Sequence, residues 1–285
     1  MEIIDDAKEE YSIKALCQAV GVKRSTYYAR VKSAQIVNIE REALLAQTKV
    51  IHSEVDACYG SRRMSAELRR RGFCVGRHQA RSLMIEADIE ADMPKPPAIP
   101  KVGGKADKAS PNLLNRGFAV DKPNTVWAGD ISYIYTATGW TYLAVVLDLS
   151  TRKVVGWAYS RCPEALLAVR ALRVAVESRK PASGLMFHSD QGCQYTAKEF
   201  RDYLLQEQIT QSMSRRGNCW DNAVVERFFR SLRTERIRKR VYASHKEAMI
   251  DISDYIAGFY NSIRLHSTLG YTSPNTRENE LHIAT

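Results

Sequence analysis

Three strand-like runs follow one another in TVWAGDISYIYTATGWTYLAVVLDLSTRKVVGWAYS, residues 125–160. Each run is rich in Val, Ile, Trp and Tyr, the residue types that favour strands. Thr138-Gly139 and Ser150-Thr151 lie between the runs and can form two turns. The pattern predicts an antiparallel meander of three strands, over residues 125–135, 140–149 and 153–160.

Helices and strands alternate after this meander. Residues 163–179 predict a helix, because they begin with Pro163 and carry apolar residues at helical spacing. A short apolar run at 185–187 predicts a fourth strand that ends at Asp190, and residues 196–208 predict a helix with Thr196 as its cap. Residues 209–214 predict a fifth strand, and a further helix follows. The order β-β-β-α-β-α-β-α predicts an α/β fold, with one mixed five-stranded sheet flanked by helices.

Two carboxylates interrupt these apolar strands. Asp130 lies inside the first strand, and Asp190 ends the fourth. An unpaired buried charge is costly, so a partner or a metal ion is expected at each. Glu226 lies one turn into the last helix, where Val225 and Phe229 mark the buried side. The sequence therefore predicts one site built from two strands and a helix.

The type of ligand predicts the chemistry of this site. If the first and fourth strands are neighbours, Asp130 and Asp190 can share a metal ion. Oxygen ligands without a set of His and Cys favour Mg²⁺ or Mn²⁺. Two such ions about 4 Å apart could clamp the attacking and leaving oxygens of a phosphodiester. Asp130, Asp190 and Glu226 are the expected ligands of a phosphoryl-transfer enzyme that acts on nucleic acid.

Residues near the three acids have weaker signals. His188 points to the same side of its strand as Asp190, and is either a hydrogen-bonding neighbour of the metals or a packed core histidine. Asp221 and Asn222 are either helix caps or supports of the site. Asp148 enters a turn, and turn chemistry explains it. The tryptophans of the predicted strands are expected in the core, and the alternative is that they are base-stacking platforms: Trp127, Trp140 and Trp157.

Basic residues predict contacts with DNA phosphates. Arg230 and Arg233 lie four and seven residues after Glu226, on the same helical face. Two segments near 11–33 and 57–87 have the pattern helix, glycine turn, helix. For the first, an ordinary helical hairpin is as common; for the second, the alternative is a solvated charged face. The arginines that we expect on DNA in the second segment are Arg62, Arg63, Arg69, Arg70 and Arg77.

Composition agrees with a nucleic-acid partner. The 285 residues have a formal net charge of +10, which favours a polyanion, although a basic protein without such a partner is the alternative. Six scattered cysteines form no CxxC pair, which argues against a zinc ribbon and a disulfide scaffold. No signal peptide or membrane span is expected. We predict a helical DNA-binding region at 1–90, a linker at 91–120 and a catalytic domain at 121–285 with a helical extension.

Four motifs in this order resemble a known family. They are WAGDISYI with YLAVVLDLSTRKVVGW, then HSDQGCQY, then SMSRRGNCWDNAVVERFFRSLRTE, then YNSIRLHSTLGYTSP. The chain resembles the catalytic subunit, encoded by the second reading frame, of bacterial insertion-sequence transposases whose catalytic domain is similar to retroviral integrase. Residues 191–225, 35 in number, separate Asp190 from Glu226, and this spacing is typical of the family.

The resemblance implies an RNase H-like fold and a DDE transposase whose metal ligands are Asp130, Asp190 and Glu226. It implies two Mg²⁺ or Mn²⁺ ions, cleavage of element ends, and strand transfer into target DNA without a covalent protein intermediate. It also implies an upstream-frame DNA-binding subunit, possibly joined by a frameshift, a homo-oligomer on DNA, and a place in the bacterial cytoplasm on the nucleoid. The alternatives are a metal-dependent nuclease of the same fold and a non-catalytic DNA-binding regulator.

Overall fold

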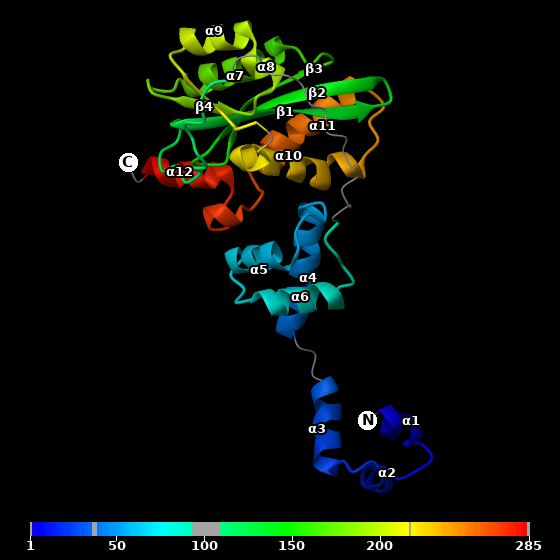
Figure 1. Ribbon diagram of the computed structural model, residues 1–285. Helices are drawn as coiled ribbons and strands as arrows, with labels where there is room; N and C mark the ends of the chain where they lie inside the picture. The colour runs from blue at the N-terminus through cyan, green and yellow to red at the C-terminus, as the bar shows by residue number, and fades with distance from the viewer. Residues whose placement is uncertain (1, 36–38, 93–108, 217, 284–285) are drawn as a thin grey trace.

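The structure is a computed structural model, which describes residues 2–35, 39–92, 109–216 and 218–283. It contains three parts (Figure 1): the amino-terminal helices (residues 2–35), the helical domain (residues 39–92) and the sheet domain (residues 109–283). Among the described residues, no helix is long and apolar enough to cross a membrane.

The amino-terminal helices are α1 (Glu2–Ala7), α2 (Ile13–Ala19) and α3 (Arg24–Gln35). They pack around Ile4, Cys17 and Tyr27. Ser12 caps α2 by accepting a hydrogen bond from the amide of Ala15, at 3.3 Å. Gly21, between α2 and α3, has a φ of +70°, which favours glycine. The predicted helix–glycine–helix arrangement is therefore confirmed here.

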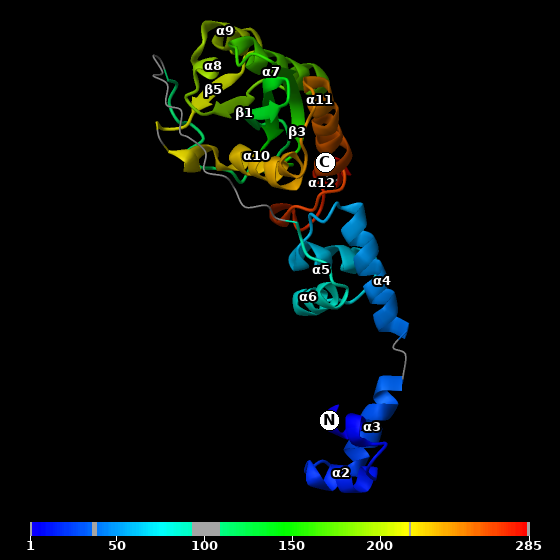
Figure 2. The same cartoon turned by 90° about the vertical axis from the view of Figure 1, so that its right-hand side faces the viewer.

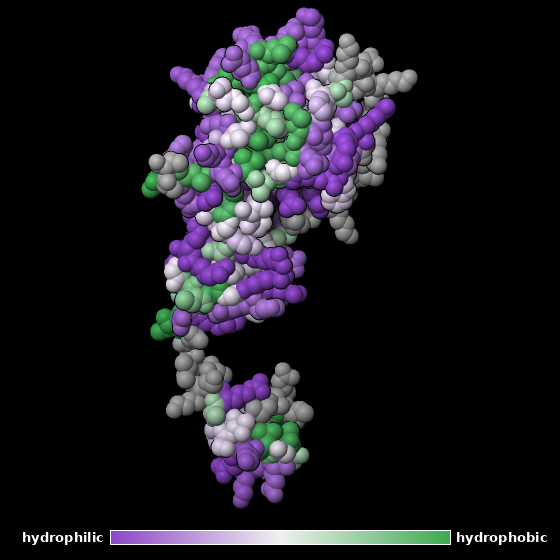
Figure 3. All heavy atoms as spheres, turned by 60° about the vertical axis from the view of Figure 1, so that its left-hand side comes forward, coloured by the Kyte–Doolittle hydropathy of each residue, from purple (hydrophilic) through white to green (hydrophobic). Residues whose placement is uncertain are grey.

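The helical domain consists of α4 (Ile39–Glu54), α5 (Ser61–Arg70) and α6 (Arg77–Glu86). Its core includes Met64, Leu68 and Leu83, and Leu265 of the sheet domain joins the same core. Gly72 has a φ of +91° and ends the turn after α5, as its place in the sequence predicts. Hydrophilic residues make up most of the surface of this domain in Figure 3.

The sheet domain contains five strands in the order β3-β2-β1-β4-β5. Strands β1 (Val126–Thr136), β2 (Gly139–Asp148) and β3 (Val154–Ser160) form the antiparallel meander that the sequence predicts. Strand β4 (Met186–Ser189) pairs in parallel with β1, and β5 (Thr210–Met213) pairs in parallel with β4. The mixed sheet is thus confirmed, and β1 and β4 are neighbours.

Helices cover both faces of this sheet, as Figures 1 and 2 show. Helices α7 (Ala165–Arg179), α8 (Cys193–Thr196) and α9 (Lys198–Gln206) lie on the face to which Trp127 and Phe187 point. Helix α10 (Ala223–Glu235), α11 (His245–Asp254) and a π-helical segment (Tyr255–Tyr260) lie on the opposite face. Gly156 allows α7 to approach β3 closely, because a Cβ there would lie 2.4 Å from the carbonyl oxygen of Ala171.

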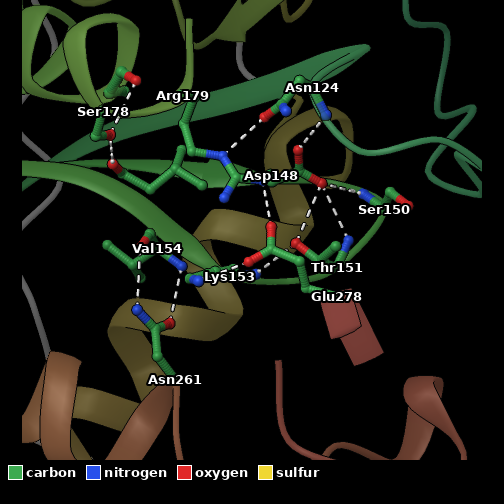
Figure 4. Close-up of polar contacts among 12 residues, drawn as sticks. Asn124, Asp148, Ser150, Thr151, Lys153, Val154, Ser178, Arg179, Asn261 and Glu278 are labelled. Carbon is green, nitrogen blue, oxygen red and sulfur yellow. Dashed lines mark hydrogen bonds and ion pairs between the residues drawn. The ribbon is translucent and has the colours of Figure 1, made fainter. Parts of the chain in front are cut away.

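Polar contacts tie the chain together at one end of the sheet (Figure 4). Asp148 accepts hydrogen bonds from the amides of Asn124, Ser150 and Thr151, so turn chemistry explains this buried carboxylate as predicted. Glu278 of α12 (Pro274–Ile283) pairs with Arg179, and it accepts a hydrogen bond from Lys153 at 2.6 Å. The carboxy-terminal helix is thereby joined to β3 and α7.

Two details differ from the sequence-based expectations or add to them. Thr196 ends α8 instead of capping the next helix; its hydroxyl bonds back to the carbonyl oxygens of Gly192 and Cys193. Part of the predicted linker, residues 93–108, lies outside the described residues. Its later part packs on the sheet domain, where the amides of Leu113 and Leu114 donate to the hydroxyl of Ser212 in β5.

Candidate active site

Strand pairing brings Asp130 and Asp190 together. Ala128 of β1 lies opposite His188 of β4, and each aspartate is two residues further along its chain. Two residues make one period of a strand, so both carboxylates project toward the face that α10 covers. The amide of Ile131 donates to Asp130 at 2.7 Å, and the amide of Gly192 donates to Asp190 at 3.0 Å. These backbone bonds orient the two carboxylates.

Helix α10 brings Glu226 to the same place. The helix packs its Val225, Phe229 and Leu232 side into the core, as the sequence predicts, and leaves Glu226 exposed in its first turn. The side-chain amide of Asn222, just before α10, donates to the carbonyl oxygen of Gly129 at 3.3 Å. This bond fixes the start of the helix against the residue that precedes Asp130.

The three carboxylates disturb one another electrostatically. Burial, followed by the charge of Asp190, raises the pKa of Asp130 to about 8, and Glu226 adds to this effect. Burial also raises the pKa of Asp190, against the opposing effect of the Gly192 amide. For Glu226, desolvation and then Asp190 raise the pKa. The site therefore holds excess negative charge that a bound cation would stabilise.

The donor set fits a hard divalent ion. All three side chains offer carboxylate oxygens, the ligands that Mg²⁺ and Mn²⁺ prefer. Within the described ranges, no three His, Cys, Asp or Glu side chains are already arranged to hold an ion. The fit consequently rests on the donor type and on the mutual repulsion of the carboxylates.

His188 is a packed histidine between β5 and the start of α10. It is fully buried, and its Nδ1 lies 2.9 Å from the hydroxyl of Ser212. That hydroxyl already accepts two backbone amides, so it must donate its own hydrogen to Nδ1. The proton of the neutral ring then lies on Nε2, which is 3.0 Å from the carbonyl oxygen of Asp221. Burial lowers the pKa of His188, in agreement with this neutral form.

Asp221 is neither a simple helix cap nor an exposed residue. Its buried carboxylate accepts hydrogen bonds from Arg215 and from Arg116, which belongs to the segment ahead of β1. The hydrogen bonds from Arg215 hold the pKa of Asp221 well below its usual range. Asn222 occupies the cap position of α10 but makes no side-chain cap bond. The capping interpretation of both residues was wrong, because each bonds to a distant segment instead.

The side chain of Asn222 also has a buried oxygen without a hydrogen-bond partner among the described residues. The whole residue is buried, and the atom concerned is Oδ1. The amide nitrogen must face Gly129, so rotating the amide would not satisfy the oxygen. The sequence placed Asn222 near the site, and the structure adds an unpaired acceptor next to Asp130.

The basic residues differ in exposure and in their partners; Arg70, for example, is exposed and also pairs with Glu67. Arg230 is exposed on α10, whereas Arg233 donates to the hydroxyl of Ser132 at 2.7 Å. In the helical domain, Arg63 pairs with the buried Glu235 of α10, so its guanidinium is engaged within the chain. The predicted DNA contacts of this domain whose side chains are exposed are Arg62, Arg69, Arg70 and Arg77.

A buried ionic cluster escaped the sequence reasoning. Glu235 accepts hydrogen bonds from Arg264 through both of its oxygens, and from Tyr255 and Arg63. One local signal could have found it: Glu235 lies three residues after Leu232, on the buried side of α10. Nothing in the local pattern identifies its partners.

Comparison with known proteins agrees with this geometry. Models described as "Integrase core domain" match residues 120–219 and 207–274, and an "HTH-like domain" model matches residues 40–97. The chain is 36% identical, over 94% of its length and 98% of the relative, to an uncharacterized 31 kDa protein of insertion element IS600 from Shigella sonnei. It is 32% identical, over 97% of both chains, to transposase InsF for insertion sequence IS3A from Escherichia coli. The chain belongs to the insertion-sequence transposases.

Solved structures are more distant from this transposase. The catalytic core domain of HTLV-2 integrase, in complex with magnesium, shares 15% sequence identity with it at a TM-score of 0.41. That match covers 54% of this chain and 95% of the integrase core. A simian T-cell lymphotropic virus intasome shares 14% identity at a TM-score of 0.45, over 80% of this chain and 73% of that one. The fold assignment rests instead on the strand order and the integrase core matches.

Proposed function

We propose that this transposase cleaves the ends of its insertion sequence and joins them to target DNA at the site of Asp130, Asp190 and Glu226. The observation that carries the proposal is the convergence of three carboxylates from β1, β4 and α10, with each pKa raised. Such a site is adapted to bind divalent cations beside a phosphodiester. The basic charge of the chain and the HTH-like match support DNA as the substrate.

Two Mg²⁺ or Mn²⁺ ions are the proposed cofactors, with Asp130, Asp190 and Glu226 as ligands. When bound, the ions would act as Lewis acids on the phosphodiester and activate the attacking water or hydroxyl group. The chain itself positions these ligands through the backbone amides of Ile131 and Gly192 and through Asn222. His188 and Asp221 are not proposed as ligands. They hold β5 and the start of α10 in place.

Basic residues on two parts of the chain are proposed to hold DNA. Arg230 and Arg233 extend from α10 beyond Glu226, where they can fix an element end beside the carboxylates. The exposed arginines of the helical domain would bind phosphates further away. We further propose a homo-oligomer on DNA, an upstream-frame DNA-binding subunit as partner, and a location on the nucleoid in the bacterial cytoplasm.

Three substitutions test the proposal. Asp130→Asn, Asp190→Asn and Glu226→Gln each preserve shape but remove a ligand charge. We expect each to abolish both nicking and joining of a labelled duplex that ends in the inverted repeats flanking this gene, with DNA binding nearly intact. Asp202→Asn is the control, because Asp202 is an exposed carboxylate on α9.

The outcomes separate the alternatives. Activity of more than a few per cent in one variant would remove that residue from the site. Cleavage without joining by the native protein would identify a nuclease. DNA binding without either reaction, in Mg²⁺ or Mn²⁺, would identify a regulator.

A further inference from the structure

Three aromatic side chains are exposed together on the β1–β2 hairpin. The exposed fractions are 40% for Tyr133, 64% for Tyr135 and 51% for Trp140. Trp140 meets both tyrosines edge-on, with ring centroids 5.4 Å from Tyr133 and 5.0 Å from Tyr135. The sequence predicted Trp140 in the core with Trp127 and Trp157, and this expectation was wrong. Large apolar side chains that gather on a surface usually mark an interaction site.

The register of the hairpin explains why these rings gather. Tyr135 lies opposite Trp140, and Tyr133 is two residues from Tyr135 on the same side of β1. Trp127 on this side is buried beneath the helices of that face, but the far end of the hairpin extends past them (Figure 1). Trp127 and Trp140 therefore occupy equivalent positions in the strand pattern. They differ only because helices cover Trp127 and do not cover Trp140.

A cation borders this aromatic patch (Tyr133, Tyr135 and Trp140). The pairing of β1 with β4 extends only to Ala128 within the described residues, so the edge of β1 is open beyond Asp130. Arg233 of α10 reaches this edge, where its guanidinium bonds to Ser132 and lies 5.8 Å from the centre of the Tyr133 ring. The patch is thus joined through Arg233 to the helix that carries Glu226.

We infer that the aromatic patch is a stacking surface for unpaired bases of the DNA strand beside the cleavage site; this inference rests on the proposed function. At about 3.3 Å per strand residue, Tyr133 and Tyr135 lie roughly 10 and 17 Å from Asp130 along β1. Because Asp130 projects to the α10 face and the patch lies on the other face, the DNA strand would pass around the open edge of β1, where Arg233 lies. With about 3.4 Å per nucleotide in a strand, the distance along β1 alone corresponds to about three to five nucleotides, which is the minimum for a path around the edge. Aromatic rings stack on any base, and a nearby cation suits the intervening phosphates.

A second copy of the protein fits this surface less well. A stable protein interface buries about 800 Å² on each partner, whereas a fully exposed aromatic side chain offers only about 150–250 Å². Three partly exposed rings therefore supply less than half of the required area.

The test compares two DNA probes with the full-length protein in EDTA, so that no cleavage occurs. Both are duplexes with a short single-stranded tail, which carries thymines in one probe and abasic sites in the other. We expect the native protein to bind the thymine tail about tenfold more tightly than the abasic tail. Trp140→Ala and Tyr135→Ala should each lose this preference with unchanged affinity for blunt duplex, whereas Trp140→Phe should keep most of it.

Other results would overturn the inference. Equal binding of the two tails by the native protein would do so, as would a full preference in both alanine variants. If Trp140→Ala instead changes the oligomeric state in light scattering and leaves the preference intact, the patch is a subunit interface. If Trp140→Ala lowers the melting temperature, Tyr135→Ala, which removes the most exposed ring, decides the matter. Cleavage in Mg²⁺ is measured separately, so that failure of the proposed function is distinguished from failure of the stacking surface.

Discussion

Helix α10 carries two glutamates whose surroundings are opposite. Glu226 in its first turn is exposed, and Asp190 together with desolvation raises its pKa. Glu235 at the end of the helix is only 4% exposed. Burial alone would raise the pKa of Glu235, but Arg264 and then Arg63 outweigh it and lower the pKa. One carboxylate faces negative charge, and the other is neutralised by positive charge.

The difference separates the proposed reactive site from a structural one. A buried charge is tolerated only where partners replace the lost water, and Glu235 has such partners on three elements: α5, the π-helical segment and the chain after it. Glu226 and its neighbours keep an unbalanced negative charge, which a bound cation would neutralise. Helix α10 thus links the proposed active site to the contact between the sheet domain and the helical domain.

Glu226→Gln should produce the largest effect on activity. Removing one carboxylate charge from a site that stabilises a phosphoryl transition state should reduce nicking and joining by about a thousandfold or more. The melting temperature without metal should stay the same or rise, because the repulsion with Asp190 is relieved. Cleavage assays and thermal melts in EDTA measure the two quantities. A marked loss of stability would mean that Glu226, like Glu235, is structural.

Glu235→Gln should have the largest effect on stability. It leaves the guanidinium of Arg264 buried with a weakened partner, and breaking a buried pair typically costs about 3–5 kcal/mol in free energy of unfolding. Urea unfolding of the variant measures this cost. Replacing both charges, as Glu235→Leu with Arg264→Met, should recover part of the loss, because the deeply buried guanidinium of Arg264 is removed with its partner and only the more exposed Arg63 loses its carboxylate. An unchanged unfolding midpoint in the single variant would contradict the comparison.

The two sites also differ in how far the sequence could predict them. Asp130 and Asp190 were identified because each breaks an apolar strand, and their proximity needed only that β1 and β4 pair. Glu235 binds Arg264, 29 residues away, and Arg63, 172 residues away, and no local pattern encodes such partners. The alternation of residues along a strand also could not show how far the helices extend over the sheet. For that reason it predicted the burial of Trp127 correctly and that of Trp140 wrongly.

The loss of folding stability in acid should come from carboxylates that are paired with positive charges, such as Glu278. Burial would raise the pKa of Glu278, but hydrogen bonds from Arg179 and Lys153 lower it below its normal value. A lowered pKa stabilises the folded state above the unfolded value, about 4.3, and this contribution is lost as the pH falls through the folded value. Unfolding curves of Glu278→Gln should therefore differ from those of the native protein at neutral pH and converge with them in acid. A constant difference across this range would exclude the carboxylate charge as the cause.

Arg230→Ala should have a moderate effect on joining alone. Arg230 is exposed, so its removal should leave the melting temperature unchanged. If it positions an element end, joining should fall by roughly tenfold, because small misplacements of the attacking hydroxyl are costly. Bulk DNA affinity should change much less, since many other cations remain. Arg233→Ala is the informative companion: its bonds to Ser132 predict a loss of stability as well.

The smallest expected effect distinguishes two neighbouring arginines. Arg62 is exposed, whereas Arg63 is bound to Glu235. Each phosphate contact releases counterions and adds about 0.9 to the slope of log affinity against log salt concentration. Arg62→Gln should therefore lower that slope by about one, at unchanged stability. Arg63→Gln should leave the slope unchanged and lower the unfolding midpoint, because it removes a partner of Glu235. Binding titrations at several salt concentrations, with urea unfolding of both variants, measure these effects. If the two variants behave alike, Arg62 and Arg63 share one role, and the division between free and paired arginines in the helical domain does not hold.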